Sequence, residues 1–436
     1  PIYKIMITHK EHIIKYFQTG IKDTKSFKIG IEHEKFLFNQ KTNGRVDYPT
    51  ILKMFTALSE FGWKPIMEKQ NIIGLQKQGK SITLEPGNQI ELSGDKLNNI
   101  HEACTESHDY LFELQQVTKK FDIKIVSSGF DPISTLSEVP NNPKQRYKVM
   151  TNDMPNGGPL SLDMMYRTCG TQINLDYNSE EDFIKKFKVI NSIVPISIAL
   201  FANSSIVEKK NSGYMSYRSK VWQETSRGGL PEVFFDNMDF EKYTDFAINF
   251  PLLFIQDNKE YLSGNNYSFL DFMNGKIKEI SNRLPSEDDL TTHLSTIFTE
   301  NRLKKYIELR SMDTCGWDCL CAGPAFNTGI LYGNLDEAYE LISKWDKSKI
   351  INAYFEAPKK GFNTELMGKD LLYWSSLLLG ISKKGLEKRD ILNKSNDNEA
   401  KFLNHLDKLI DNKTTNADHM INKFSKNENL NDLYDN

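Results

Sequence analysis

The sequence is poor in the features that would assign a function at sight. Its 436 residues include only 8 histidines and 5 cysteines, and 55 basic against 58 acidic residues give a net charge of −3. No basic stripe stands out from this mixture, so we expect no nucleic-acid partner. An odd number of cysteines in a long chain rich in lysine and glutamate fits a reducing cytoplasm better than a secreted disulfide scaffold. We therefore expect a cytoplasmic protein.

Long hydrophobic runs are also missing. Residues 1–17 are interrupted by charged side chains before any apolar run develops, which argues against a signal peptide. The longest apolar run, residues 193–202, contains Pro195 and is far shorter than the roughly 20 residues that cross a bilayer. We expect no membrane partner.

Three motifs of common nucleotide and ester chemistry are absent. The chain has no Gly-x-x-x-x-Gly-Lys-Ser phosphate loop, no Gly-x-Gly-x-x-Gly after a strand, and no Gly-x-Ser-x-Gly. Bound phosphates would then have to be held by metal ions together with arginine and lysine. The spacing of Cys315, Cys319 and Cys321 is similar to that of zinc ligands, but a second ligand cluster and a nearby histidine are missing. We interpret these cysteines as thiols.

Glutamate, by contrast, recurs in strand-like segments. Residues 30–36, Gly-Ile-Glu-His-Glu-Lys-Phe, predict a strand in which Glu32 and Glu34 point to one face and His33 to the other. Two neighbouring carboxylates without a cation repel each other, so such a pair is typical of a metal site or a shared proton. We interpret His33 as a packing residue inside the fold.

A second acidic pair lies in residues 72–93, which predict a meander of three short strands. A three-residue loop in its last turn pairs Thr83 with Glu91 and separates the polar face from the apolar face. Asn88 can take the left-handed position that such a loop needs. Glu85 and Glu91 then share a face.

A fifth carboxylate, Glu308, lies two residues before Arg310 in the predicted strand 306–312, so both side chains share a face. We predict that the acidic positions line one concave sheet face and hold divalent cations against a nucleoside triphosphate. A site rich in glutamate and poor in histidine favours magnesium over zinc. The expected metal ligands are Glu32, Glu34, Glu85, Glu91 and Glu308.

Two stretches between the predicted elements look irregular, residues 131–167 and residues 204–229. Long irregular connections in compact enzymes are commonly lids or binding loops. The first stretch carries Arg146 among several cations that would suit an anionic substrate. We predict that Arg146 binds substrate from a loop.

The chain shows no internal repeat and no clear linker, so we expect a single catalytic domain over 1–436. Its sheet-and-helix core is expected over 1–381 and a helical extension over 382–436. This extension is the most polar part of the chain, and we expect its final dozen residues to be poorly ordered.

Five stretches in the right order resemble glutamate-cysteine ligase of the plant and proteobacterial type. They are residues 30–36, 84–94, 162–174, 215–222 and 306–310. The similarity runs from about Gly30 to about Lys388, and several long motifs in one order argue against chance.

The resemblance implies an α+β fold of the glutamine synthetase and guanidino kinase group. Such a fold has a curved, mainly antiparallel sheet that forms an active-site cup wrapped by helices. The resemblance also implies ligation of the γ-carboxylate of L-glutamate to the amine of L-cysteine through a γ-glutamyl phosphate, the first step of glutathione biosynthesis. ATP is the expected co-substrate and magnesium the expected cofactor, in a monomer or homodimer. Plant members have a redox switch that uses a C-terminal cysteine, but this chain has none after Cys321.

Roles for individual residues follow from the same resemblance. Arg310 is expected to be catalytic, because its planar guanidinium can bind two oxygens of a transferred phosphoryl group. Glu34 is also expected to be catalytic. The expected substrate-binding residues are Arg218, Trp222, Met215, Arg146, Gln172 and Asn174. Two alternatives stay open: a ligase of this fold with a different amine acceptor, and a non-catalytic relative that binds nucleotide or metal.

Overall fold

A computed structural model describes residues 5–426 and 428–435. Its main sheet contains nine antiparallel strands. Their bounds are β1 Ile29–Asn39, β2 Lys64–Glu68, β3 Asn71–Lys77, β4 Lys80–Leu84, β5 Ile90–Ser93, β6 Ile123–Val126, β7 Gly170–Leu175, β12 Asn301–Leu303 and β13 Ile307–Asp313. Eight of them follow the order β12-β13-β7-β1-β5-β4-β3-β2, and β6 pairs with the second half of β1.

Six short strands form three separate hairpins. These are β8 Ile206–Val207 with β9 Lys210–Asn211, β10 Phe254–Asp257 with β11 Glu260–Ser263, and β14 Glu365–Leu366 with β15 Lys369–Asp370.

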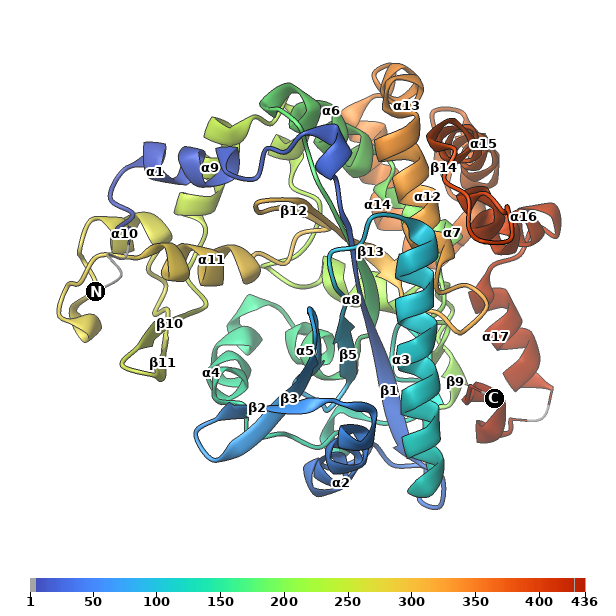
Figure 1. The fold of residues 1–436 in the computed structure, drawn as a ribbon, viewed down its shortest axis with the longest axis horizontal. Coiled ribbons are helices and arrows are strands. Elements are labelled where there is room, and N and C mark those ends of the chain that lie inside the picture. The colour runs from blue at the N-terminus through green and yellow to red at the C-terminus, as the bar shows by residue number, and fades with distance from the viewer. Residues whose placement is uncertain (1–4, 427, 436) are drawn as a thin grey trace.

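Helices wrap the sheet (Figure 1). Those of the first half are α1 Lys10–Gln18, α2 Tyr48–Leu58, α3 Ile100–Lys120, α4 Gln145–Asp153, α5 Ser161–Arg167, α6 Glu180–Ser192, α7 Val194–Leu200 and α8 Tyr217–Gln223. Those of the second half are α9 Phe240–Asn249, α10 Phe269–Met273, α11 Glu287–Ser295, α12 Ala322–Thr328, α13 Leu335–Ile342, α14 Lys347–Lys360, α15 Leu371–Arg389, α16 Asn404–Asp411 and α17 Asn416–Ser425.

Strand β1 is the centre of the sheet and has two different faces. Gly30, Glu32 and Glu34 are half-buried, whereas Ile31 and His33 between them are buried. The buried face packs under α3, where the rings of His33 and Tyr110 lie 5.5 Å apart. The role of His33 as a packing residue is confirmed, and Glu32 and Glu34 share the opposite face.

The predicted hairpin register is confirmed. Thr83 lies opposite Glu91 and the pairing continues to Leu84 with Ile90, while Glu85 N donates to Gln89 O at 2.9 Å. Asn88 has the left-handed φ of 62° that the three-residue loop needs. Glu85 and Glu91 therefore reach the same side of the sheet.

The two stretches expected to be irregular contain helices. Residues 131–167 form α4 and α5, and α8 lies within residues 204–229. The prolines and glycines of residues 131–167 hide these helices in the sequence. In the structure α5 buries Met164 and Met165 in a hydrophobic cluster that it shares with α8. Packing, rather than helix propensity, decides these segments.

The C-terminal region also differs from expectation. Helix α15 runs through residues 381–382 without a break, so no element ends at the expected division. The final residues were expected to be poorly ordered, which is wrong for the described ones. Leu433 and Tyr434 are buried in a cluster with Phe38 of β1 and Val126 of β6. Within residues 5–426 and 428–435, no helix has the length and apolar character needed to cross a membrane.

Candidate active site

Four of the five predicted glutamates line one cavity of about 210 Å³ on the open face of the sheet. They come from β1, from the turn after β4, and from β5, which the antiparallel pairing places side by side. The cavity glutamates are Glu32, Glu34, Glu85 and Glu91. Four arginines also line this cavity and form what we call its basic wall: Arg146, Arg218, Arg302 and Arg310. Carboxylates and guanidinium groups thus line one hollow.

Nearby cations compensate the carboxylates of β1 and β5 only in part. Burial, and then the charge of Glu85, raise the pKa of Glu34 to about 8, although Gly170 N donates to its Oε2 at 3.0 Å. Burial and the neighbouring glutamates hold the pKa of Glu91 well above its usual range. Among the residues that the structure describes, its Oε1 accepts from the hydroxyls of Thr83 and Ser93, at 3.2 and 3.3 Å. This part of the hollow favours a bound cation or a proton.

Glu308 has a different environment. Burial alone would raise the pKa of its carboxyl group, but Arg302 and Lys304 hold this pKa far below its usual range. The Arg302 side chain donates to one carboxylate oxygen, and Lys304 Nζ lies 2.8 Å from the other. Glu308 does not line the cavity itself, but it lies close to Glu32. Burial, and then the charge of Glu308, raise the pKa of Glu32.

The acidic group fits a hard divalent cation. Its donors are carboxylate oxygens that repel one another, and magnesium prefers such ligands. Glu32, Glu34, Glu85 and Glu91 are the carboxylates that could hold such an ion, since all four line the same cavity. Glu308 is already paired with two cations, so it reaches a metal only if they shift.

The basic wall presents unpaired donors. Arg310 Nη1 donates to Gln172 Oε1 at 3.1 Å, and Arg218 Nη2 donates to Arg310 O at 2.9 Å. Both guanidinium groups lie against the ring of Trp222, at 5.7 Å for Arg218 and 5.5 Å for Arg310. Within the described chain, Arg218 Nε, Arg310 Nε and Trp222 Nε1 are buried without a hydrogen-bond partner. A buried unpaired donor is costly, so this wall favours an anionic ligand.

Helix α4 closes one side of the cavity. Arg146 and Tyr147 line the cavity, and Arg146 Nη2 donates to the Tyr147 hydroxyl at 3.3 Å. Lys144 lies just before α4, where burial lowers its pKa to about 8. Arg146 was predicted on a loop, but a helix carries it to the cavity.

The other predicted substrate-binding residues differ in position. Gln172 and Trp222 line the cavity, and Asn174 Nδ2 donates to Glu32 Oε1 at 3.0 Å. Met215 lies elsewhere: its backbone N donates to Pro358 O, and its side chain is next to Gly361. The structure therefore does not bring Met215 to the cavity.

Two site residues were missed in the sequence. Arg302 lines the cavity and Lys304 pairs with Glu308, but both lie in a short segment before the predicted strand. In the structure β12 pairs with β13, and this pairing places Arg302 opposite Glu308. Predicting β12 as a strand would have placed this arginine on the acidic face.

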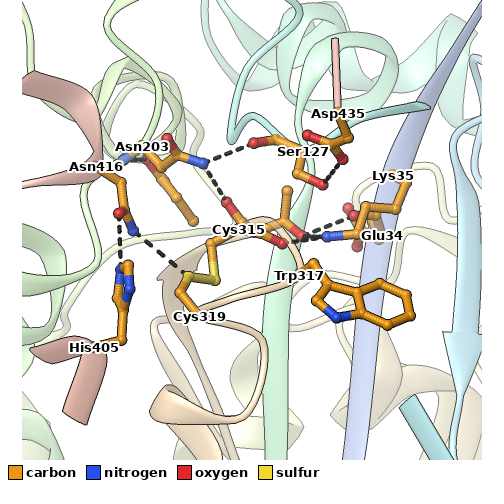
Figure 2. Close-up of a disulfide and its surroundings, with 12 residues drawn as sticks. Glu34, Lys35, Ser127, Asn203, Cys315, Trp317, Cys319, His405, Asn416 and Asp435 are labelled. Atoms are coloured by element: carbon orange, nitrogen blue, oxygen red, sulfur yellow. Dashed lines mark hydrogen bonds between the residues drawn. A yellow bond between two sulfur atoms is a disulfide. The ribbon is translucent and has the colours of Figure 1, made fainter. Parts of the chain in front are cut away.

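The interpretation of Cys315, Cys319 and Cys321 as thiols is wrong. Cys104 of α3 is bonded to Cys321, and Cys315 to Cys319, while Cys169 is free and buried. Figure 2 shows the second disulfide in the segment after β13, close to β1. There Lys35 Nζ donates to Thr314 Oγ1, which in turn donates to the backbone oxygen of Glu34 at 2.8 Å. Spacing in the sequence cannot show that α3 supplies Cys104.

Comparison with known proteins agrees with this arrangement. Glutamate–cysteine ligase B of Oryza sativa subsp. japonica, named chloroplastic, is 39% identical over 421 residues, which cover 95% of this chain and 84% of the relative. The chloroplastic enzyme of Solanum lycopersicum is 38% identical and matches 95% of this chain and 79% of its own length. Because these relatives are named chloroplastic, the expectation of a cytoplasmic location is contradicted.

A solved structure shares the fold. Glutamate–cysteine ligase from Francisella tularensis in complex with AMP has a TM-score of 0.53, with 13% identity, 95% of this chain and 88% of that chain covered. The expected α+β class, with a mainly antiparallel sheet wrapped by helices, is confirmed. The model of glutamate-cysteine ligase family 2 matches residues 28–436. With this match and relatives of nearly 40% identity over most of its length, the chain belongs to glutamate-cysteine ligase family 2.

Proposed function

We propose that the cavity uses ATP and magnesium to join the γ-carboxylate of glutamate to the amine of cysteine. The family match supports formation of γ-glutamylcysteine, the first step of glutathione biosynthesis. The observation that carries the proposal is that carboxylates with raised pKa values share one cavity with Arg218 and Arg310, each of which has a buried Nε without a partner in the described structure. A site of this kind suits cations together with anionic substrates.

The chemistry has two steps. A γ-carboxylate oxygen of glutamate attacks the terminal phosphorus of ATP, which gives γ-glutamyl phosphate and ADP. The cysteine amine then attacks the acyl carbon, loses a proton, and phosphate leaves. Magnesium held by the cavity glutamates would offset the negative charge of the phosphate oxygens.

The protein residues hold and orient the reacting groups. Arg310, whose Nε has no partner in the described structure, would bind the phosphoryl group that is transferred. Arg218 would bind the α-carboxylate of glutamate, since it is the next guanidinium along this wall. Arg146 would bind phosphate oxygens from α4. Trp222 and Phe298 give the arginines an apolar wall that excludes water.

A phosphate-release assay tests this proposal. Purified protein with ATP and magnesium should release phosphate only when glutamate and cysteine are both present, in one-to-one ratio with γ-glutamylcysteine. Release that needs no cysteine, or no release with any amine acceptor, would contradict it. A panel of small amines, compared by kcat/KM, tests the preference for cysteine.

A further inference from the structure

Two buried carboxylates, those of Glu300 and Asp313, lie around Arg218, and the reaction itself does not require them. We call this environment the seat of Arg218. Glu300 and Asp313 are 5% and 3% exposed, and Arg218 is 5% exposed. Burial raises the pKa of both carboxyl groups, and Arg218 is the foremost cation opposing this rise in each. Buried carboxylates of this kind are costly unless they compensate a charge.

Asp313 holds the segment that carries Arg218. Its carboxylate accepts from Asn203 N, from the Ser204 hydroxyl at 2.7 Å and from the Ser216 hydroxyl at 2.9 Å. Ser216 caps α8, and Ser204 Oγ accepts from Arg218 N at 3.1 Å. Arg218 Nη1 lies 4.0 Å from Asp313 Oδ1. The same carboxylate thus fixes the helix start and faces the guanidinium.

Glu300 is held from another direction. The Tyr354 hydroxyl of α14 donates to Glu300 Oε1 at 3.0 Å, and the backbone oxygen of Glu300 accepts from Arg310 N at 2.9 Å. Glu300 therefore connects α14 to the backbone of Arg310, and its carboxylate interacts with the charge of Arg218.

Gly170 makes room for the guanidinium. A Cβ at this position would lie 2.6 Å from Arg218 Nη2 and 3.0 Å from its Cζ. No residue with a side chain fits there unless Arg218 moves. Gly170 N also donates to Glu34, so the seat of Arg218 adjoins the acidic group.

We propose that Glu300, Asp313 and Gly170 are positioning residues that set Arg218 to bind the α-carboxylate of glutamate. The inference rests on the proposed function. One Nη of Arg218 is bonded to Arg310 O, whereas Arg218 Nε has no hydrogen-bond partner in the described structure, and the residue lines the cavity. Glutamate is the matching substrate because the γ-carboxylate must reach the phosphoryl group beside Arg310.

Steady-state kinetics with three variants tests the seat. Glu300→Gln should raise the KM for glutamate about tenfold, while kcat and the KM values for ATP and cysteine change less than twofold. Tyr354→Phe, which removes only the hydroxyl donor to Glu300, should raise the KM for glutamate about threefold. Gly170→Ala should have the largest effect, since the guanidinium must move.

Matched controls separate positioning from stability. Tyr332→Phe removes a hydroxyl that donates to Lys28 O, away from Arg218, and Gly380→Ala adds a methyl group with no atom within 4 Å. Both should keep the wild-type KM for glutamate. Thermal unfolding of every variant checks that it is folded at the assay temperature.

Arg218→Lys distinguishes the possible failures. If this variant raises the KM for glutamate but Glu300→Gln and Tyr354→Phe do not, the positioning proposal is overturned while the function stands. If all variants lower kcat and raise every KM alike, the seat is merely structural and the proposal is also overturned. A wild-type protein without glutamate-dependent activity would overturn the proposed function together with the inference.

Discussion

Glu34→Gln is the most informative single change at the acidic group. It replaces a carboxylate by a neutral amide of nearly the same shape and keeps an oxygen for the hydrogen bond from Gly170 N. If the carboxylate binds metal, turnover should fall by at least about a hundredfold. The fold should remain, because the variant removes repulsion from Glu85 instead of creating it.

The raised pKa of Glu34 determines how strongly the affinity for magnesium should depend on pH. Burial and Glu85 raise the pKa of Glu34 from 4.5 to about 8, so at pH 7 the carboxyl group is about nine-tenths protonated. Magnesium must displace that proton. Because of Glu34 alone, the affinity for magnesium should rise about tenfold from pH 7 to pH 9 and level off above the pKa of Glu34.

The same shift affects stability without metal. A raised folded-state pKa means that the native protein binds this proton more tightly than the unfolded chain. Stability from this group is therefore full below pH 4.5 and is lost as pH rises through about 8. Glu34→Gln should unfold at a higher temperature than wild type at pH 9 in the absence of magnesium.

Differential scanning fluorimetry and a magnesium titration of activity, both between pH 6.5 and pH 9, measure these effects. Wild type should gain thermal stability from magnesium increasingly with pH, and the variant should gain much less. Retained activity, or an unchanged response to magnesium in the variant, would refute the metal role of Glu34.

Three further predictions concern other parts of the molecule. Burial lowers the pKa of His293 to about 3, so stability is full above pH 6.5 and falls on acidification. The difference in urea unfolding free energy between wild type and His293→Gln should therefore shrink by about 2 kcal/mol from pH 7 to pH 5, and an unchanged difference would contradict the burial argument. Arg310→Lys should lower kcat about a hundredfold with little change in stability, because an ammonium group cannot grip two oxygens; equal kcat would exclude the assigned role. Cys104→Ser should lower the melting temperature under oxidising conditions only, since Cys104 and Cys321 join α3 to the start of α12; an equal loss in excess reductant would show that packing is responsible.

Local patterns in the sequence were enough to place most of the acidic group. Alternation along one strand puts Glu32 and Glu34 on the same side, and the face separation of one hairpin fixes the register of Glu85 and Glu91. Both deductions depend only on the two-residue period of a strand and on the geometry of a short turn. The roles of the predicted site residues remain predictions that the experiments above test.

Contacts between distant segments could not be read in the same way. Arg302 and Lys304 neutralise Glu308, α4 rather than a loop brings Arg146 to the cavity, and Cys104 meets Cys321 across 217 residues. Helices α4 and α5 form in a segment rich in proline and glycine because their apolar side chains are buried by other elements.

The sequence by itself therefore determined the family, the strand faces and the kind of chemistry that clustered glutamates support. Only the tertiary structure decided which carboxylates are compensated only in part and which are already paired. The physical reason is that strand alternation is a property of neighbouring residues, whereas burial and charge compensation depend on side chains that folding brings together from across the chain.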